Sequence, residues 1–212
     1  MKIQLRLIAL LTAAFLLPAL AQDPIELPKP QMDGGRPLMQ VLRDRKTVRD
    51  FSPEALPPQV LSNLLWAAFG INRPDSGRRT APSARNFQET DIYVALATGT
   101  YLYDAKANKL QPVIAADIRK ATGNQPFVGI APVELIYVAD YARMGNASEA
   151  DKTTYSHADT GFIGQNVYLF CASEGLAAVV RGGLDRQAIS TTLKLRPEQH
   201  VTLVHTVGYP KK

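Results

Sequence analysis

The spacing of apolar residues early in the chain predicts two helices with a basic segment between them. Pro37 suits the first position of a helix, and the apolar residues that follow share one face: Leu38, Val41 and Leu42. A second helix is expected between Pro57 and Gly70, where apolar residues recur at helical spacing: Val60, Leu61, Leu64, Leu65 and Ala68. Residues 71–89 show no such period. A loop of about 20 residues is uncommon in a compact domain and is often functional.

Alternating and continuous runs of β-forming residues predict the strands of one sheet. Residues 90–97 alternate like a strand, and residues 101–113 form two short strands around a polar turn at 107–108. Residues 114–123 have the composition of a short helix. Residues 132–140 are an almost unbroken β-rich run, which is typical of a central strand.

The last third of the chain continues the mixture of helices and strands. Residues 141–156 are predicted to form a loop, and Asp159 can cap a long helix that ends at Gly175. The remaining elements follow in order: a strand at 176–180, a tight turn at Gly182-Gly183, a helix capped by Asp185 and a strand at 200–210. This order predicts an α+β fold built around one sheet.

The N-terminus has the pattern of a secretory signal peptide. Lys2 and Arg6 precede an apolar run, and small residues at Ala19 and Ala21 suit cleavage before Gln22. The expected organisation is therefore a signal peptide at 1–21, an extended Pro- and Gly-rich leader at 22–36, and one domain at 37–212. We expect export to the periplasm or the medium, and no stable membrane span after cleavage. An uncleaved N-terminal anchor is the alternative.

Charge and cysteine content exclude some classes of function. Without the two basic residues of the signal, the net charge falls from +5 to +3, which is too mild for bulk binding of nucleic acid. Cys171 is the only cysteine, so no internal disulfide is possible. Its apolar neighbours favour a buried thiol over a nucleophile.

Familiar catalytic signatures are missing from the sequence. The three histidines, His157, His200 and His205, lack the spacing of metal ligands, so no metal site is expected. Neither a Gly-x-Gly-x-x-Gly motif nor a Walker-type phosphate loop is present. No glycine flanks Ser83, as a nucleophile elbow would require. Hydrolase and nucleotidase functions therefore lose support.

A basic segment after the first helix is a candidate anion site. In an extended chain Arg45, Thr47 and Arg49 alternate onto one side, and two guanidinium groups with a hydroxyl suit a phosphate or an electron-rich ring edge. A solvated basic face is the alternative.

Two further segments carry candidate ligand contacts. Asn86, in "PSARN", offers a donor and an acceptor together, which matches the imide edge of a flavin or a pyrimidine, although without context simple turn chemistry is the favoured explanation. Gly182 and Gly183 follow a strand and allow backbone N–H groups to approach a ligand closely, or they form a plain turn.

Together these segments resemble the FMN-dependent nitroreductase family. The resemblance is carried by "RKTVRDF" (45–51), "PSARN" (82–86), "EGLAAVVRGGLD" (174–185) and "VGYP" (207–210), and it covers about residues 37–210. The segment "LSNLLWAAFGINR" also looks like the thiazoline/oxazoline-dehydrogenase-like branch. The chain departs from the family pattern in ending at "GYPKK" and in having Gly182 where many relatives have a glutamate.

The resemblance implies a nitroreductase-like fold, a mostly antiparallel sheet flanked by helices in an intertwined homodimer with FMN at the interface. Arg45 and Thr47 would hold the phosphate and ribityl chain, with Lys46 as a weaker backbone candidate. Arg49 would reach the pyrimidine edge. The other cofactor-binding candidates are Ser83, Asn86 from the second subunit, and Arg181, Gly182 and Gly183 near the flavin N5.

The expected function is that of an exported flavoprotein that transfers two electrons by a ping-pong route. NAD(P)H is the usual donor in the family, and a membrane quinol or a partner reductase would replace it outside the cytosol. The acceptor would be a small flat electron-poor molecule. No side chain is required as acid or base, so no catalytic residue is assigned. A binding module that holds a flat ligand or flavin without turnover is the alternative.

Overall fold

The computed structural model describes residues 22–212, and the predicted signal peptide at 1–21 lies outside them. Its centre is a seven-stranded sheet in the order β1-β6-β5-β4-β7-β9-β8, in which every pairing is antiparallel. The strands are β1 (Ile25–Glu26), β4 (Thr90–Leu96), β5 (Gly99–Asp104), β6 (Lys109–Ile114), β7 (Val133–Asp140), β8 (Ala177–Arg181) and β9 (Gln199–Gly208). The predicted α+β class and antiparallel sheet are confirmed.

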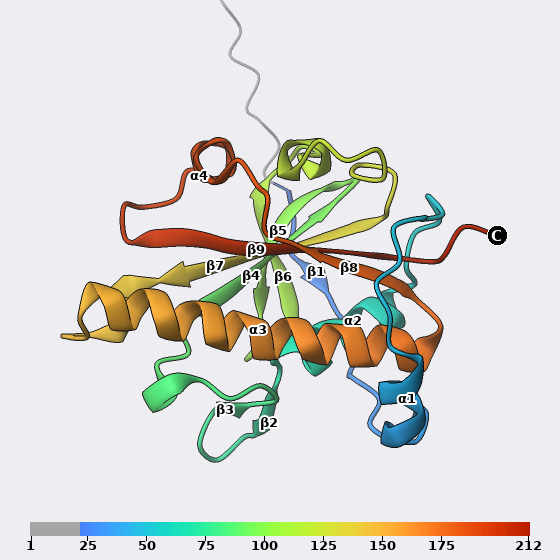
Figure 1. Ribbon diagram of the computed structural model, residues 1–212, viewed down its shortest axis with the longest axis horizontal. Helices are drawn as coiled ribbons and strands as arrows, with labels where there is room; N and C mark the ends of the chain where they lie inside the picture. The colour runs from blue at the N-terminus through green and yellow to red at the C-terminus, as the bar shows by residue number, and fades with distance from the viewer. Residues whose placement is uncertain (1–21) are drawn as a thin grey trace, which may run out of the picture.

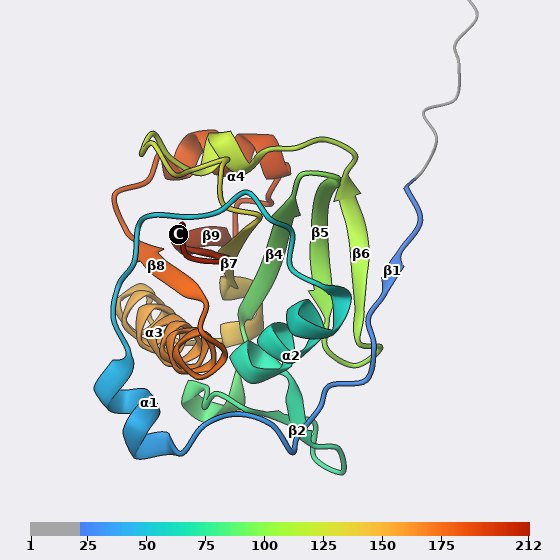
Figure 2. The same cartoon turned by 90° about the vertical axis from the view of Figure 1, so that its right-hand side faces the viewer.

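Helices cover both faces of this sheet. The helices are α1 (Leu38–Asp44), α2 (Pro58–Phe69), α3 (Glu149–Glu174) and α4 (Arg186–Leu193). Figure 1 shows α3 running the length of one face, and Figure 2 shows α2 and α3 on one side of the sheet with α4 on the other. The larger core lies between the sheet and the pair α2 and α3, and a second cluster packs under α4 around Ile189 and Leu193.

The predicted central strand is confirmed in β7. It pairs with β4 on one side and β9 on the other, and all eight of its residues are buried. Burial on both faces explains its almost unbroken run of β-forming residues. The bounds of α2, and its end before Gly70, also match the apolar period.

Three local predictions are wrong. The long helix α3 begins at Glu149 and its cap is Ser148, not Asp159. Only Arg119–Thr122 of the helix expected at 114–123 is helical, as the short 3-10 turn η2. The loop at 71–89 contains a small hairpin of β2 (Ile71–Arg73) and β3 (Arg78–Arg79), followed by the 3-10 turn η1 (Ala84–Asn86).

The segment expected as a leader without a core packs on the domain. β1 pairs with β6 at the edge of the sheet, and Leu27 is buried in the main core. Residues 22–36 are extended, as predicted, but they share the core of the domain. Between Gln22 and Lys212 no helix combines the length and apolarity needed to cross a bilayer.

Candidate functional site

The basic segment lies along the open edge of β8, the last strand of the sheet. The amide of Val48 donates to the carbonyl of Ala178 at 3.0 Å, and Phe51 forms an isolated antiparallel bridge with Pro210. The segment is therefore fixed as an extended chain beside β8. In an extended chain alternate side chains share a side, and Arg45 and Thr47 do so here.

Arg45 and Thr47 meet at the side chain of Tyr168 on α3. The Thr47 hydroxyl lies 3.1 Å from the Tyr168 hydroxyl, and the Arg45 guanidinium carbon lies 5.3 Å from the centre of the Tyr168 ring. The amide of Val180 donates to the same Tyr168 hydroxyl at 2.9 Å. Arg45 and Thr47, both predicted from the sequence, are thus joined through Tyr168 to Val180 of β8, two positions before Gly182.

Arg49 belongs to a different surface. It lines a cavity of about 1150 Å³ together with the C-terminal residues Lys211 and Lys212. The C-terminus is held there, because the amide of Lys211 donates to the carbonyl of Asp50 at 3.1 Å. The short tail therefore places two cations beside Arg49.

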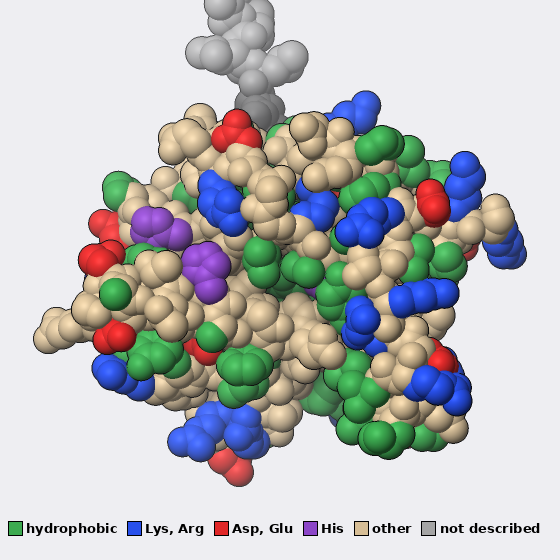
Figure 3. All heavy atoms as spheres, in the orientation of Figure 1, with side chains coloured by type: hydrophobic (Ala, Val, Ile, Leu, Met, Phe, Trp, Pro, Cys, Tyr) green, Lys and Arg blue, Asp and Glu red, His purple; other side chains and the backbone are tan. Residues whose placement is uncertain are grey.

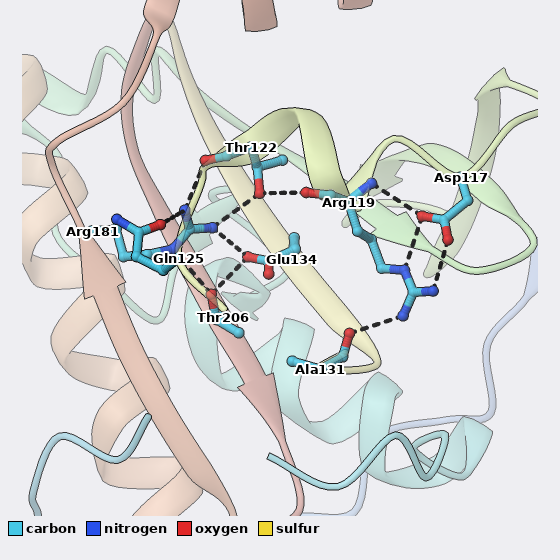
Figure 4. A network of polar contacts seen from close by, with 8 residues as sticks. All are labelled: Asp117, Arg119, Thr122, Gln125, Ala131, Glu134, Arg181 and Thr206. Carbon is cyan, nitrogen blue, oxygen red and sulfur yellow. Dashed lines mark hydrogen bonds and ion pairs between the residues drawn. The ribbon is translucent and has the colours of Figure 1, made fainter. Parts of the chain in front are cut away.

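The glycine turn is open, whereas the arginine before it is not. Gly182 and Gly183 are exposed, and a Cβ added at Gly183 would meet nothing within 4 Å. Arg181 is buried. Its guanidinium pairs with Glu134 at 2.7 Å and donates to Thr122 (Figure 4).

The side chain of Arg181 is therefore directed away from the open turn, and cofactor binding at Arg181 stays a prediction that falls to its backbone. The guanidinium points into the protein, where five donors need partners, and the polar groups of β7, β9 and the turn η2 provide them. The ion pair instead ties the end of β8, and so the start of the glycine turn, to the rest of the sheet.

The "PSARN" segment forms a strained turn over the first half of α3. Arg85, Asn86 and Gln88 have positive φ angles of 51°, 58° and 48°. The Ser83 hydroxyl accepts from the amide of Gln88 at 2.8 Å, so its side chain holds the turn rather than pointing outward. Asn86 is exposed, and its side-chain oxygen accepts from Gln88 at 3.0 Å. Left-handed residues with polar side chains are found where the surroundings hold them and often at functional sites.

Two carboxyl groups lie beneath this turn. Glu89 is 0% exposed and accepts from the Ser83 hydroxyl at 3.2 Å, and Asp159 of α3 accepts from the amide of Ala84 at 2.8 Å. Burial, reinforced by the charge of Asp159, raises the pKa of Glu89. The carboxyl groups fix the backbone of the turn that presents Asn86.

Within one chain the two halves of the predicted site stay apart. Thr47 contacts Tyr168, whereas Ala84 contacts Asp159, nine residues earlier on α3. At 1.5 Å per residue the two anchor points lie about 14 Å apart along the helix axis. The fold joins Arg45 and Thr47 to the strand that ends at the glycine turn, and it places Ser83 and Asn86 elsewhere.

No local pattern in the sequence marks Tyr168, Glu89 or Asp159 as part of the site. Tyr168 lies in an apolar stretch of α3, where it is indistinguishable from a core aromatic residue. Asp159 was interpreted as a helix cap. The position of Glu89, just after a polar loop and before a buried strand, is a feature of the sequence that could indicate a buried carboxyl group.

Comparison with known proteins agrees with this architecture. The model of the nitroreductase family matches residues 42–209. A candidate nitroreductase from Methanocaldococcus jannaschii is 29% identical over 196 residues, which cover 88% of this chain and 97% of that protein. A crystal structure of a candidate nitroreductase from Ralstonia eutropha superposes with a TM-score of 0.86 at 42% identity, covering 90% of this chain and 91% of the other.

A more distant structure shows the same fold. The NADPH:FMN oxidoreductase from Vibrio harveyi, complexed with NAD+, superposes with a TM-score of 0.63 at 20% identity, covering 82% of this chain and 69% of that one. Assignment to the thiazoline/oxazoline-dehydrogenase-like branch stays a prediction. The extent of the family match, together with the antiparallel sheet and the basic segment along its open edge, shows that the chain belongs to the nitroreductase family.

Proposed function

We propose that the chain is an exported FMN-dependent oxidoreductase that passes two electrons, as hydride, from a donor to a flat electron-poor acceptor by a ping-pong route. Membership of the nitroreductase family supports an oxidoreductase activity. The observation that carries the proposal is the meeting of Arg45 and Thr47 at Tyr168 of α3, whose hydroxyl also accepts from Val180 on the strand that ends in the open glycine turn.

The residues present fit FMN in charge and in shape. Exposed cations and a hydroxyl suit a phosphate and a polyol chain. The backbone is exposed at Gly182 and Gly183, with open space beside Gly183, and this suits close approach of a planar ring. FMN, when bound, supplies the hydride chemistry, and the protein supplies binding and orientation.

The proposed roles follow from these fits. Arg45 and Thr47 hold the phosphate and the ribityl chain, with the backbone of Lys46 beside them, and Arg49 neutralises charge at the pyrimidine edge. Backbone amides at Gly182 and Gly183 face the reactive end of the ring. Ser83 shapes the turn, and Asn86 donates to the ring edge of the second subunit's cofactor.

A reverse orientation of FMN, with its phosphate at Arg49 and its ring edge at Arg45, has an observation in its favour. Arg49, Lys211 and Lys212 line one cavity, and these cations would suit a phosphate as well as Arg45 and Thr47 do. Riboflavin lacks the phosphate. The variant that loses the preference for FMN over riboflavin therefore identifies the arginine that binds the phosphate, and so the orientation.

The test begins with the absorption spectrum of the purified mature protein and identification of any released chromophore. We expect a yellow protein that releases FMN at about one per subunit. Arg45→Ala should lower the affinity for FMN by about tenfold or more, because one charged hydrogen bond to the ligand is lost. The affinity for riboflavin should fall much less. Lys106→Ala, an exposed cation in the β5–β6 turn, is the control and should leave both affinities unchanged.

The outcomes separate the alternatives. If Arg49→Ala, and not Arg45→Ala, removes the preference for FMN over riboflavin, the reverse orientation is correct. A colourless protein that takes up no added FMN would contradict the proposed function and favour a binding module.

Export and the identity of the donor are separate proposals. The pattern of residues 1–21 supports cleavage before Gln22, and intact-mass measurement of the protein recovered from the periplasm or medium tests it. Because reduced nicotinamides are cytosolic, we propose a membrane quinol or a partner reductase as donor. Rapid reduction by NADPH at cellular concentrations would contradict this.

A further inference from the structure

We propose that Tyr168 is a positioning residue that sets the hydrogen-bond polarity of Thr47 and ties the basic segment to the glycine-turn strand. This inference rests on the proposed function, because it concerns how the chain prepares the same site for an anionic ligand. Its side chain, 9% exposed, contacts groups from three separate parts of the chain.

Either hydroxyl of the Tyr168–Thr47 pair can donate to the other, and the bond from the Val180 amide favours one assignment. The amide of Val180 can only donate, so the phenol oxygen accepts this bond at 2.9 Å. The phenol proton then needs an acceptor, and the Thr47 hydroxyl oxygen lies 3.1 Å away. With Tyr168 donating to it, Thr47 keeps its own proton free.

Thr47 is exposed, so a ligand can reach its hydroxyl and accept the freed proton. Thr47 thus becomes a donor for a ligand oxygen, of a phosphate or of a polyol, and not merely another polar group. A threonine without this partner would spread its proton over several rotamers, and ordering one on binding costs free energy.

The ring of Tyr168 orders a second residue of the site. Arg45 lies over one face with its guanidinium carbon 5.3 Å from the ring centre, which is within the range of a cation–π contact. The buried ring of His205 meets the tyrosine at 4.6 Å in an edge-on arrangement. Packing against His205 fixes the ring, and the ring holds Arg45 beside Thr47.

The position of Val180 extends the effect to the glycine turn. Val180 is two residues before Gly182, and its amide donates to the Tyr168 hydroxyl. One hydroxyl therefore fixes the spacing between the basic segment and the turn, the two features proposed to hold opposite ends of the cofactor.

The experiment compares Tyr168→Phe with Tyr103→Phe. The first removes the shared hydroxyl and keeps the ring. The second is matched, because Tyr103 on β5 is also buried and its hydroxyl has no hydrogen-bond partner within residues 22–212. FMN affinity should fall by up to about tenfold in Tyr168→Phe, because Thr47 loses the partner that keeps its proton free for one hydrogen bond to the ligand, and should stay unchanged in Tyr103→Phe.

A double-mutant cycle with Thr47→Val separates positioning from a general loss of stability. If Tyr168 acts through Thr47, then Tyr168→Phe in the Thr47→Val background should cause little further loss of FMN affinity. Additive losses, or wild-type affinity in Tyr168→Phe, would overturn the inference.

Amide exchange in the ligand-free protein gives a readout that does not depend on FMN. The Val180 amide should exchange faster in Tyr168→Phe than in the wild type or in Tyr103→Phe, and unchanged exchange would overturn the inference. A wild-type protein that takes up no FMN would contradict the proposed function. The exchange of Val180 would then decide by itself whether Tyr168 ties the segment to the strand.

Discussion

Burial determines the chemical state of individual side chains in this protein. Cys171 is 1% exposed, which confirms the prediction of a buried thiol, and burial raises its pKa. His205 is fully buried, with its Nδ1 3.3 Å from the Tyr137 hydroxyl. Burial, together with the charge of Arg181, lowers the pKa of His205 to about 3. The native imidazole is therefore neutral at ordinary pH.

A pH dependence of stability follows from His205. In the unfolded chain a histidine takes up a proton near pH 6.5, whereas the native ring does so only near pH 3. Stability from this group is therefore present above about pH 6.5 and is lost as pH falls toward 3, by about 1.4 kcal/mol per pH unit. Urea denaturation at several pH values should show a shallower decline in His205→Gln. His200→Gln, an exposed histidine on the same strand, is the control, and an equal slope in wild type and His205→Gln would contradict the assignment.

The long helix α3 links most of the candidate site, and its first third was not recognised as helix. Residues 149–158 have few apolar side chains, so no helical period is visible there. A capping signal was present, since Ser148 is followed three positions later by Asp151. In the structure the Ser148 hydroxyl accepts from the amide of Asp151 at 3.1 Å.

Loss of this cap should destabilise the protein without touching the site. Ser148→Ala is expected to lower the free energy of unfolding by about 1 kcal/mol, because one amide at the helix start loses its partner. Ser148→Asp should retain most of the stability, since a carboxylate also accepts this bond. Denaturant midpoints of the three proteins measure the effect, and equal midpoints would show that the cap contributes nothing.

At the scale of the whole molecule, apolar residues remain exposed around α1 and α3. Met39 and Leu38 on α1 are 76% and 61% exposed, and Phe162 on α3 is 49% exposed. Figure 3 shows hydrophobic side chains gathered over α1. This surface lies on the side of the sheet that carries α3, and it is the surface we propose to be buried in a homodimer. Such a dimer would bring Asn86 of one subunit to Arg45 of the other.

Disrupting this surface should dissociate the dimer and release the cofactor together. Phe162→Glu places a charge where an apolar contact is proposed. Light scattering after gel filtration should report a monomer, and titration with FMN should show weak binding. Val113→Glu, an exposed apolar residue on β6 near the other edge of the sheet, is the control and should remain dimeric. A monomeric wild-type protein that binds FMN tightly would contradict the composite site.

The sequence by itself determined the elements whose signal is local. The apolar period of residues 58–69 and the β-rich run of 133–140 specify a helix and a central strand, because each pattern reports burial within a few residues. The segments around Arg45, Asn86 and Gly182 indicated the family for the same reason, since each motif is short and contiguous.

Only the tertiary structure decided which of these residues meet. It placed β9 between β7 and β8 and turned Arg181 inward to Glu134. It also brought Tyr168 to Thr47, 121 residues earlier in the chain. Such contacts depend on how distant segments pack, and no local pattern records the partner of a buried charge or hydroxyl. A tyrosine in an apolar stretch looks the same whether it fills the core or positions a site.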